Sequence, residues 1–246
     1  MQFQFRQQSY LFRFKIGFFI LCLFFVFLFS MLGVWQLHRY HYKKMLVSTF
    51  QDRLTAAPKP FLQVTGSGDL QFQRITVEGH YLNALTMLVQ NKFNQGRSGF
   101  EVLTPLQIRG QEKLLLIDRG WIQKPANQNL PSIDHVNDKQ QIIGYIKLLD
   151  ERQFTLGKNI LNPAGPQIVM QKIDLDELSQ ITHQSFYPFI LRLDASEPNG
   201  FVRDWVISIV PPERHMGYAI QWFVLVIVVL IGYLAFCSEK KNANKK

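Results

Sequence analysis

The hydrophobic positions of this chain gather in two long runs without Asp, Glu, Lys or Arg, one near each end. The first covers residues 16–35 and is rich in Phe and Leu, and the second covers residues 215–236 and is rich in Val, Ile and Leu. Each meets the requirement of about 20 apolar residues for a helix that crosses a bilayer. Nothing between them comes close. The pattern therefore predicts two transmembrane helices, with a tail of residues 1–15 before the first and a tail of residues 237–246 after the second.

The first run follows a basic segment, which is also typical of a secretory signal. Its apolar stretch is longer than the hydrophobic region of a usual signal, and residues 31–35 supply no small-x-small cleavage pattern. We therefore interpret it as a retained membrane anchor.

Basic residues dominate both tails, which sets the expected orientation. Of the formal net charge of +9, the tails contribute +6 and the residues between the spans +3. The positive-inside bias places both tails in the cytoplasm, or in the mitochondrial matrix, and exports residues 36–214. Three basic residues just after the first run oppose this orientation, namely Arg39, Lys43 and Lys44. Charges in a long exported segment influence orientation less than charges in short tails, so the tails decide it. The lack of an organelle presequence favours a bacterial inner membrane. This charge distribution indicates contact with anionic lipid and argues against nucleic acid.

The central segment has the pattern of a β-rich domain. Short apolar or alternating stretches, separated by turn residues, occur at residues 74–78, 85–90, 100–104, 114–117, 142–146, 167–171 and 189–193. Residues 109–112 read as a hairpin connection, and residues 124–138 as a long polar loop. We expect a mostly antiparallel β (α+β) domain, compatible with a small barrel, carried between two transmembrane α-helices.

Two helices complete the expected fold. Asp174 can cap one of them, with Glu177 three positions on and an apolar stripe at Leu175, Leu178 and Ile181. A charged helix from residue 36 to about 54 continues the first span and ends before the proline-containing run at 56–60.

The sequence offers little sign of catalysis. No Gly-x-Ser-x-Gly elbow, His-Glu-x-x-His pair or phosphate-binding glycine loop occurs, so we expect no enzyme. The two cysteines, Cys22 and Cys237, lie in or beside the spans, which argues against a thiol oxidoreductase or a thiolate copper chaperone. His38 and His41 can share a helix face, either as solvated residues near lipid headgroups or as part of a metal site that needs further ligands.

Polar and aromatic residues cluster where the spans meet the exported side. His215, Tyr218 and Trp222 fall on one helical stripe, and Trp35 and Arg39 are four apart on the other helix. If the helices pack, Gly33 and Gly217 would permit close approach, and Gln36 and Gln221 could satisfy each other or a ligand.

Two interpretations of this cluster stay open on the residues alone. Trp and Tyr are common interfacial anchors, and His and Arg extend toward the headgroups. Alternatively, the neutral imidazole of His215 binds a metal at the bilayer edge. Haem suits this site, because Trp222 and Tyr218 could contact a flat apolar ring while Arg39 or Arg214 pairs with its propionates.

Four motifs in series resemble those of the Surfeit locus protein 1 family. They are Gly33-Val34-Trp35-Gln36-Leu37-His38-Arg39, then Gly79-His80-Tyr81 with residues 99–106, then Asp118-Arg119-Gly120-Trp121-Ile122, and finally residues 215–223. Two residues depart from the family pattern. Asp118 stands where Asn is frequent in the family, and Glu213 stands where some members have Asn. We assign a role to neither. For Arg119-Gly120-Trp121 we favour a structural role over substrate contact, because a buried Arg needs a partner.

The resemblance implies a non-enzymatic helper in the assembly of a haem–copper oxidase (cytochrome c oxidase). Such a protein would assist formation of the haem a centre of the catalytic subunit, with that subunit, haem a synthase and membrane lipid as partners. The family's closing-motif histidine carries over to His215 as candidate iron ligand. The predicted haem a pocket comprises His215, Tyr218, Trp222, Gln221, Trp35, Gln36, Arg39 and Arg214.

Two other classes of function compete with this one. One is a haem-free scaffold that clasps the oxidase subunit during assembly. The other is a sensor or secretion component, which we disfavour because tails of about 15 and 10 residues leave no room for a cytoplasmic domain.

Overall fold

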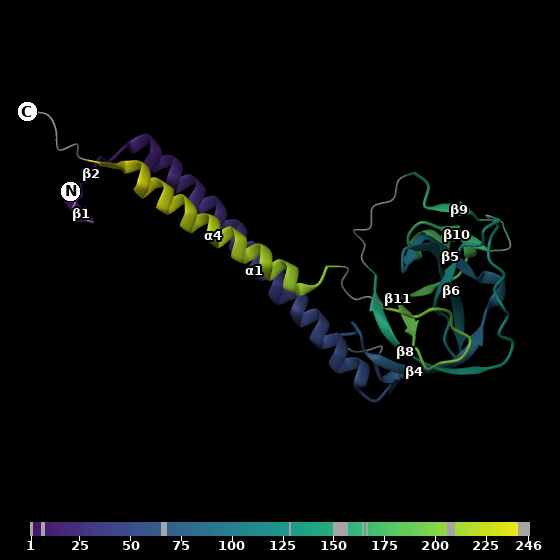
Figure 1. Ribbon diagram of the computed structural model, residues 1–246. Coiled ribbons are helices and arrows are strands. Elements are labelled where there is room, and N and C mark those ends of the chain that lie inside the picture. Colours follow the sequence, from purple (N-terminus) through teal and green to yellow (C-terminus); the bar gives the residue numbers. More distant parts are fainter. Residues whose placement is uncertain are drawn as a thin grey trace, which may run out of the picture. The chain divides into compact units, whose positions relative to one another are not determined.

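The two apolar runs form two long helices, α1 (Ile16–Thr55) and α4 (Pro212–Cys237) (Figure 1). This computed structural model describes residues 2–5, 8–64, 68–127, 129–149, 157–163, 165, 167–205 and 210–240. Both helices are long and apolar enough to cross a membrane. As predicted, α1 continues past its apolar half and ends before Pro58. Proline at the first position of α4 suits a helix start, because that residue needs no amide donor.

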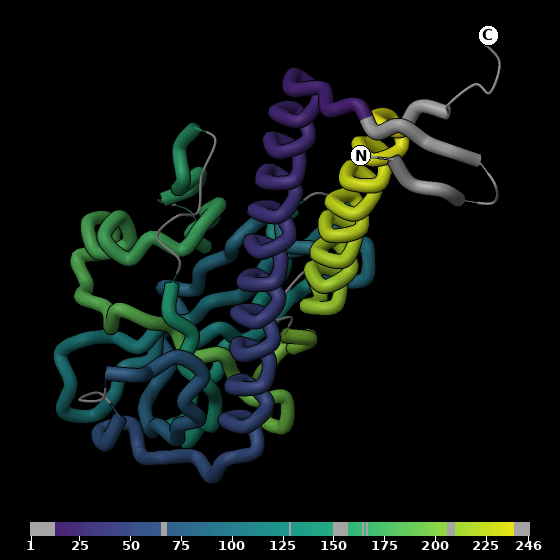
Figure 2. The backbone as a smooth tube through the Cα atoms, turned by 90° about the vertical axis from the view of Figure 1, so that its left-hand side faces the viewer, coloured from purple at the N-terminus to yellow at the C-terminus, as the bar shows by residue number. Residues whose placement is uncertain are grey.

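The two helices lie side by side and form one unit with both ends of the chain, Met1–Ser48 and Ile207–Lys246 (Figure 2). Aromatic side chains line their contact: the rings of Phe18 and Phe236 are 4.3 Å apart, and those of Phe29 and Trp222 are 5.6 Å apart. Strands β1 (Gln2–Phe5), β2 (Gln8–Phe12) and β12 (Ser238–Lys240) pair as a small antiparallel sheet in this unit.

The second unit, Thr49–Val206, is built on a closed barrel. Its wall consists of β4 (Arg74–Tyr81), β8 (Gln140–Leu148), β11 (Phe186–Leu193), β7 (Leu114–Gln123) and β6 (Arg97–Ile108), in that order. A further pairing of β4 with β6 closes the ring. The pairs in the wall are antiparallel except β7 with β11. The predicted β-rich domain and barrel are thus confirmed.

Shorter elements extend one side of the barrel. Strand β5 (Met87–Asn94) pairs with β6, β10 (Ile168–Met170) with β5, and β9 (Ile160–Asn162) with β10. Near the start of the unit, β3 (Lys59–Pro60) pairs with β4 beside the single turn α2 (Phe61–Val64), and η1 (Asn83–Leu85) precedes β5. Helix α3 (Leu175–Thr182) begins as predicted, because the Asp174 carboxylate accepts a hydrogen bond from the amide of Glu177.

Two of the apolar cores lie on the two faces of β7. The barrel core fills the ring and includes Tyr81, Leu115 and Ile117. The outer core includes Leu114, Leu116 and Ile190 and packs under β9, β10 and α3. Alternate residues of β7 therefore enter different cores, because successive side chains of a strand point to opposite faces.

The predicted strands all occur, with shifted ends. The strand expected from residue 85 begins at Met87, because residues 83–85 form a 3-10 turn. The sequence pattern did not predict strands β3 and β9, because two or three residues are too few to show a periodicity.

Candidate functional site

A polar contact joins Gln36 of α1 to His215 of α4. Oε1 of Gln36 lies 2.8 Å from Nδ1 of His215, and both residues are half-buried. Because an amide oxygen only accepts, a neutral imidazole here carries its proton on Nδ1 and leaves a lone pair on Nε2. No described residue hydrogen-bonds Nε2. The pair therefore presents an oriented imidazole that can ligate a metal through Nε2.

Apolar packing one to two turns further along the two helices holds this pair in place. On α4, Ala219 is buried and Trp222 stacks near Phe29. These residues follow His215 at spacings of four and seven, which is one face of a helix. On α1, Gly33 lies against the ring of Phe223: a Cβ there would lie 2.8 Å from Cζ of that ring. The prediction that Gly33 permits close approach is confirmed.

Two further expectations for this contact are wrong. The space that a Cβ of Gly217 would occupy is open, so Gly217 does not bring the helices together. Gln36 bonds to His215 and Gln221 is exposed, so the two glutamines do not pair. The reason is helix rotation. Residues 215, 219 and 222 lie on the face of α4 that meets α1, whereas residues 217 and 221 lie about 200° and about 240° around the helix from residue 215, on its other side.

The other predicted pocket residues line the outside of the helix pair. Trp35 is 58 % exposed and Tyr218 49 %, and Arg39, Arg214 and Gln221 are exposed as well. Arg39 lies 5.8 Å from the ring of Tyr42. Their contact with a cofactor stays a prediction. His38 and His41 are also exposed, and the described residues contain no cluster of three or more His, Cys, Asp or Glu suited to a metal ion.

Sequence reasoning missed a buried group of charges on the outer face of the barrel. Nε of Arg192 in β11 lies 3.3 Å from Oδ2 of Asp118 in β7, and its Nη2 lies 3.4 Å from Oε1 of Glu101 in β6. Lys92 in β5 bonds to Glu101 at 2.9 Å, and the Trp205 ring covers the guanidinium at 4.4 Å. Burial raises the pKa of Asp118 from 3.8 to about 7, with Glu101 adding to the rise. An isolated Arg between two leucines, Leu191 and Leu193, was the available signal.

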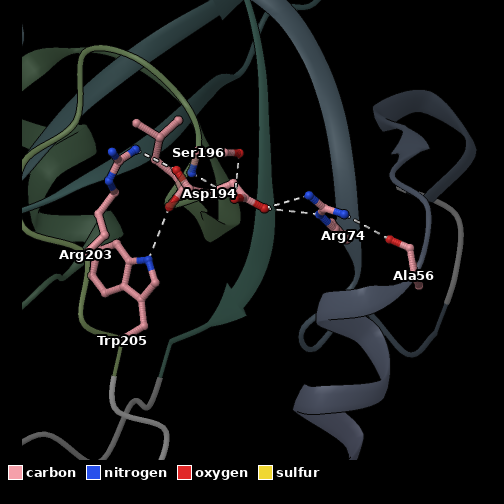
Figure 3. A network of polar contacts seen from close by, with 7 residues as sticks. Ala56, Arg74, Asp194, Ser196, Arg203 and Trp205 are labelled. Carbon is pink, nitrogen blue, oxygen red and sulfur yellow. Dashed lines mark hydrogen bonds and ion pairs between the residues drawn. The ribbon is translucent and has the colours of Figure 1, made fainter.

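A second polar network ties the two ends of the barrel unit to its wall (Figure 3). Arg74 in β4 donates to the Asp194 carboxylate at 2.8 Å and to the carbonyl of Ala56, just after α1. Arg203 donates to the carbonyl of Asp194 at 2.6 Å, and the indole of Trp205 donates to that of Leu193. The network fixes the points at which the chain enters and leaves the barrel.

The Asp118-Arg119-Gly120-Trp121 motif lies in β7 and is built into the wall. Asp118 and Arg119 are both buried. The Trp121 indole donates to the carbonyl of Lys92 at 3.1 Å, and the Trp121 amide to that of Val202 at 2.7 Å. These contacts agree with a structural role for Gly120 and Trp121. Arg119 has different surroundings from those expected, since its guanidinium lies by aromatic rings other than Trp121.

Comparison with known proteins points in one direction. A model of the SURF1 family matches residues 23–227. An uncharacterised SURF1-like protein of Mycobacterium bovis is 24 % identical over 227 residues, which cover 89 % of this chain and 82 % of that protein. A SURF1-like protein of Rickettsia felis is 24 % identical over 83 % of this chain and 90 % of its own length, and one of Caenorhabditis elegans is 23 % identical over 85 % and 70 %. The residues that the family model matches include most of both helices and the whole barrel.

Proposed function

This chain belongs to the SURF1 family, and from that premise we propose that it is an assembly factor for a haem–copper terminal oxidase. In the proposed role, it holds haem a at the edge of the membrane while the haem a centre of the catalytic subunit forms. Haem a synthase would deliver the haem, and the catalytic subunit would receive it. The protein would lie in the inner membrane with both termini in the cytoplasm and the barrel exported.

The bond between Gln36 and His215 carries this proposal. Histidines that ligate metals usually donate their second ring nitrogen to a fixed acceptor, which sets the tautomer and orients the ring. Gln36 supplies this acceptor across the helix contact at 2.8 Å. Because the partner is an acceptor on Nδ1, Nε2 keeps its lone pair for a metal.

The surroundings of His215 suit a flat, apolar, acidic ligand. Trp222 and Phe29 supply aromatic surface about two turns along the helices from His215, and Arg39 and Arg214 are exposed cations that could pair with propionates. When bound, haem a would supply the iron and its redox chemistry. The protein itself would contribute the iron ligand, Nε2 of His215, together with Gln36, which orients the imidazole ring, and an apolar aromatic surface.

The experiment is an optical spectrum and haem extraction of the full chain, purified from cells that make haem a. We expect sub-stoichiometric haem with the spectrum of a histidine ligand. His215→Ala should lose it, whereas His38→Ala, at an exposed histidine on α1, should keep it. Equal haem content in wild type and His215→Ala would remove His215 as the ligand.

The exposed face of the helix pair supports a second candidate, a haem-free scaffold. Trp35 and Tyr218 are large, exposed and close in sequence to the Gln36–His215 pair, so an oxidase helix could pack on them. In that case no preparation would carry haem, His215→Ala would still co-purify with the oxidase, and a Trp35→Ala/Tyr218→Ala variant would not.

A further inference from the structure

A buried arginine on the barrel-core side of β7 lacks a carboxylate partner. The guanidinium carbon of Arg119 lies 5.5 Å from the ring centre of Tyr81, which is a member of the barrel core. Arg119 is only 2 % exposed, and its one hydrogen bond among the described residues runs from Nε to the carbonyl of Asn199 at 2.9 Å. No described carboxylate lies within ion-pair distance of Arg119. Asp134 interacts with it only by longer-range electrostatic attraction.

Two donors at this place have no acceptor among the described residues. Nη1 of Arg119 and the hydroxyl of Tyr81 are both buried, and no described residue forms a hydrogen bond with either of them. The two side chains are neighbours, with the guanidinium carbon 5.5 Å from the centre of the Tyr81 ring. Burial raises the pKa of Tyr81 to about 12, so its hydroxyl stays a donor at neutral pH. Buried donors without acceptors are rare in folded proteins and call for a missing partner.

The backbone is shaped to aim Arg119 at this place. Val102 pairs with Gly120 and Leu103 with Asp118, which leaves Arg119 as the extra residue of a β-bulge. Gly120 has φ +115°, and a Cβ there would lie 2.7 Å from the carbonyl oxygen of Val202. Bulges redirect side chains next to functional sites.

We propose that Arg119 and Tyr81 form a binding site for an oxyanion, the carboxylate or phosphate of a small ligand. An oxyanion accepts from both unpaired donors and compensates the buried positive charge, whereas a water molecule would satisfy the donors but leave the charge unpaired. Two aromatic rings stabilise the cation, those of Tyr81 and Phe201, and the second lies 5.1 Å from the guanidinium. Nη1 of the guanidinium stays available to the ligand. Barrel ends are common places for small ligands.

The test is thermal unfolding of the full chain in detergent, titrated with inorganic phosphate or with acetate while potassium chloride holds the ionic strength constant. Wild type should show a saturable rise in the melting temperature. Tyr81→Phe removes one donor and keeps the ring, so the dissociation constant should rise about tenfold. Arg119→Lys keeps the charge but loses the guanidinium fork, and should also bind more weakly. Tyr187→Phe, which loses a hydroxyl bonded to Gln111 elsewhere, should bind as wild type does.

A saturable response to phosphate alone would identify a phosphorylated ligand, and a response to acetate a carboxylate ligand; both support the site. No saturable response in wild type would overturn the proposal. Equal responses in wild type and Tyr81→Phe would indicate an adventitious ion only and would also overturn it. Because this site is in the barrel and the assay measures no haem, its failure would leave the proposed role of His215 standing.

Discussion

Replacing Arg192 by methionine should destabilise the barrel strongly, although methionine fills much of the same space. Arg192 is the cation between two buried carboxylates: the side chain of Asp118 is 0 % exposed and that of Glu101 9 %. Removing one partner of a buried ion pair costs about 3–5 kcal/mol, because the other charge is left buried and unpaired. In a unit of this size 1 kcal/mol shifts the melting temperature by about 2–4 °C. The expected loss is therefore about 10 °C.

The effect should depend on pH with a defined sign. Because burial raises the pKa of Asp118 from 3.8 to about 7, the unfolded chain releases this proton at lower pH than the folded protein does. Its contribution to stability is thus largest below about pH 4 and falls as the pH rises toward 7. Loss of Arg192 should raise the pKa of Asp118 further, and each added unit converts to about 1.4 kcal/mol. The gap between Arg192→Met and wild type should therefore be smaller at pH 5.5 than at pH 8.

The assay is circular dichroism of thermal unfolding of the full chain in detergent at these two pH values. Lys139→Met is the matched control, because Lys139 pairs with Glu78 at the surface and both side chains are at least 43 % exposed. An exposed pair contributes at most about 1 kcal/mol. Adding Asp118→Leu to Arg192→Met should recover part of the loss, since it removes the orphaned charge. A loss of stability in Arg192→Met no larger than that in Lys139→Met would contradict the prediction, as would a double variant less stable than Arg192→Met alone.

Three further outcomes are expected. Gly33→Leu should separate the helices by clashing with Phe223 and lower the haem retained by the purified chain, whereas Gly217→Leu, into open space, should not; equal haem in both would contradict the packing. Gln36→Leu should weaken haem retention by about 10-fold or more in extraction assays, as loss of partners behind metal ligands does, and unchanged retention would remove Gln36 from the site. Asp174→Ala should lower the stability of the barrel unit by about 1 kcal/mol in urea unfolding, through the lost α3 cap.

Much of the fold could be predicted because its signals are local. Two uncharged runs of bilayer length predicted α1 and α4, and short alternating stretches predicted the wall strands. Asp174 with Glu177 marked the start of α3, since a cap needs only residues three apart. The exact ends of the strands and the short strands β3 and β9 were not predicted. A strand of two or three residues depends on the strand with which it pairs, and not on its own sequence.

The candidate site was predicted only in part. Residue types and helical spacing brought His215, Gln36 and Gly33 forward, and the structure joins the first two at 2.8 Å and packs the third on the facing helix. The pairing of glutamines and the role of Gly217 were wrong, because spacing fixes which residues share a face but not how two helices are rotated against each other. Arg192 with Asp118 was missed, since the partners are 74 residues apart.

The sequence by itself thus determined the two membrane helices, the β-rich domain between them and the family motifs, because length, hydrophobic period and residue order are properties of the chain alone. Only the tertiary structure decided that β4 closes on β6, that Arg119 lies in a bulge beside Tyr81, and that Gln36 meets His215 rather than Gln221. These contacts depend on strand register and helix rotation. Both are set by the packing of many side chains at once, so no local pattern could record them.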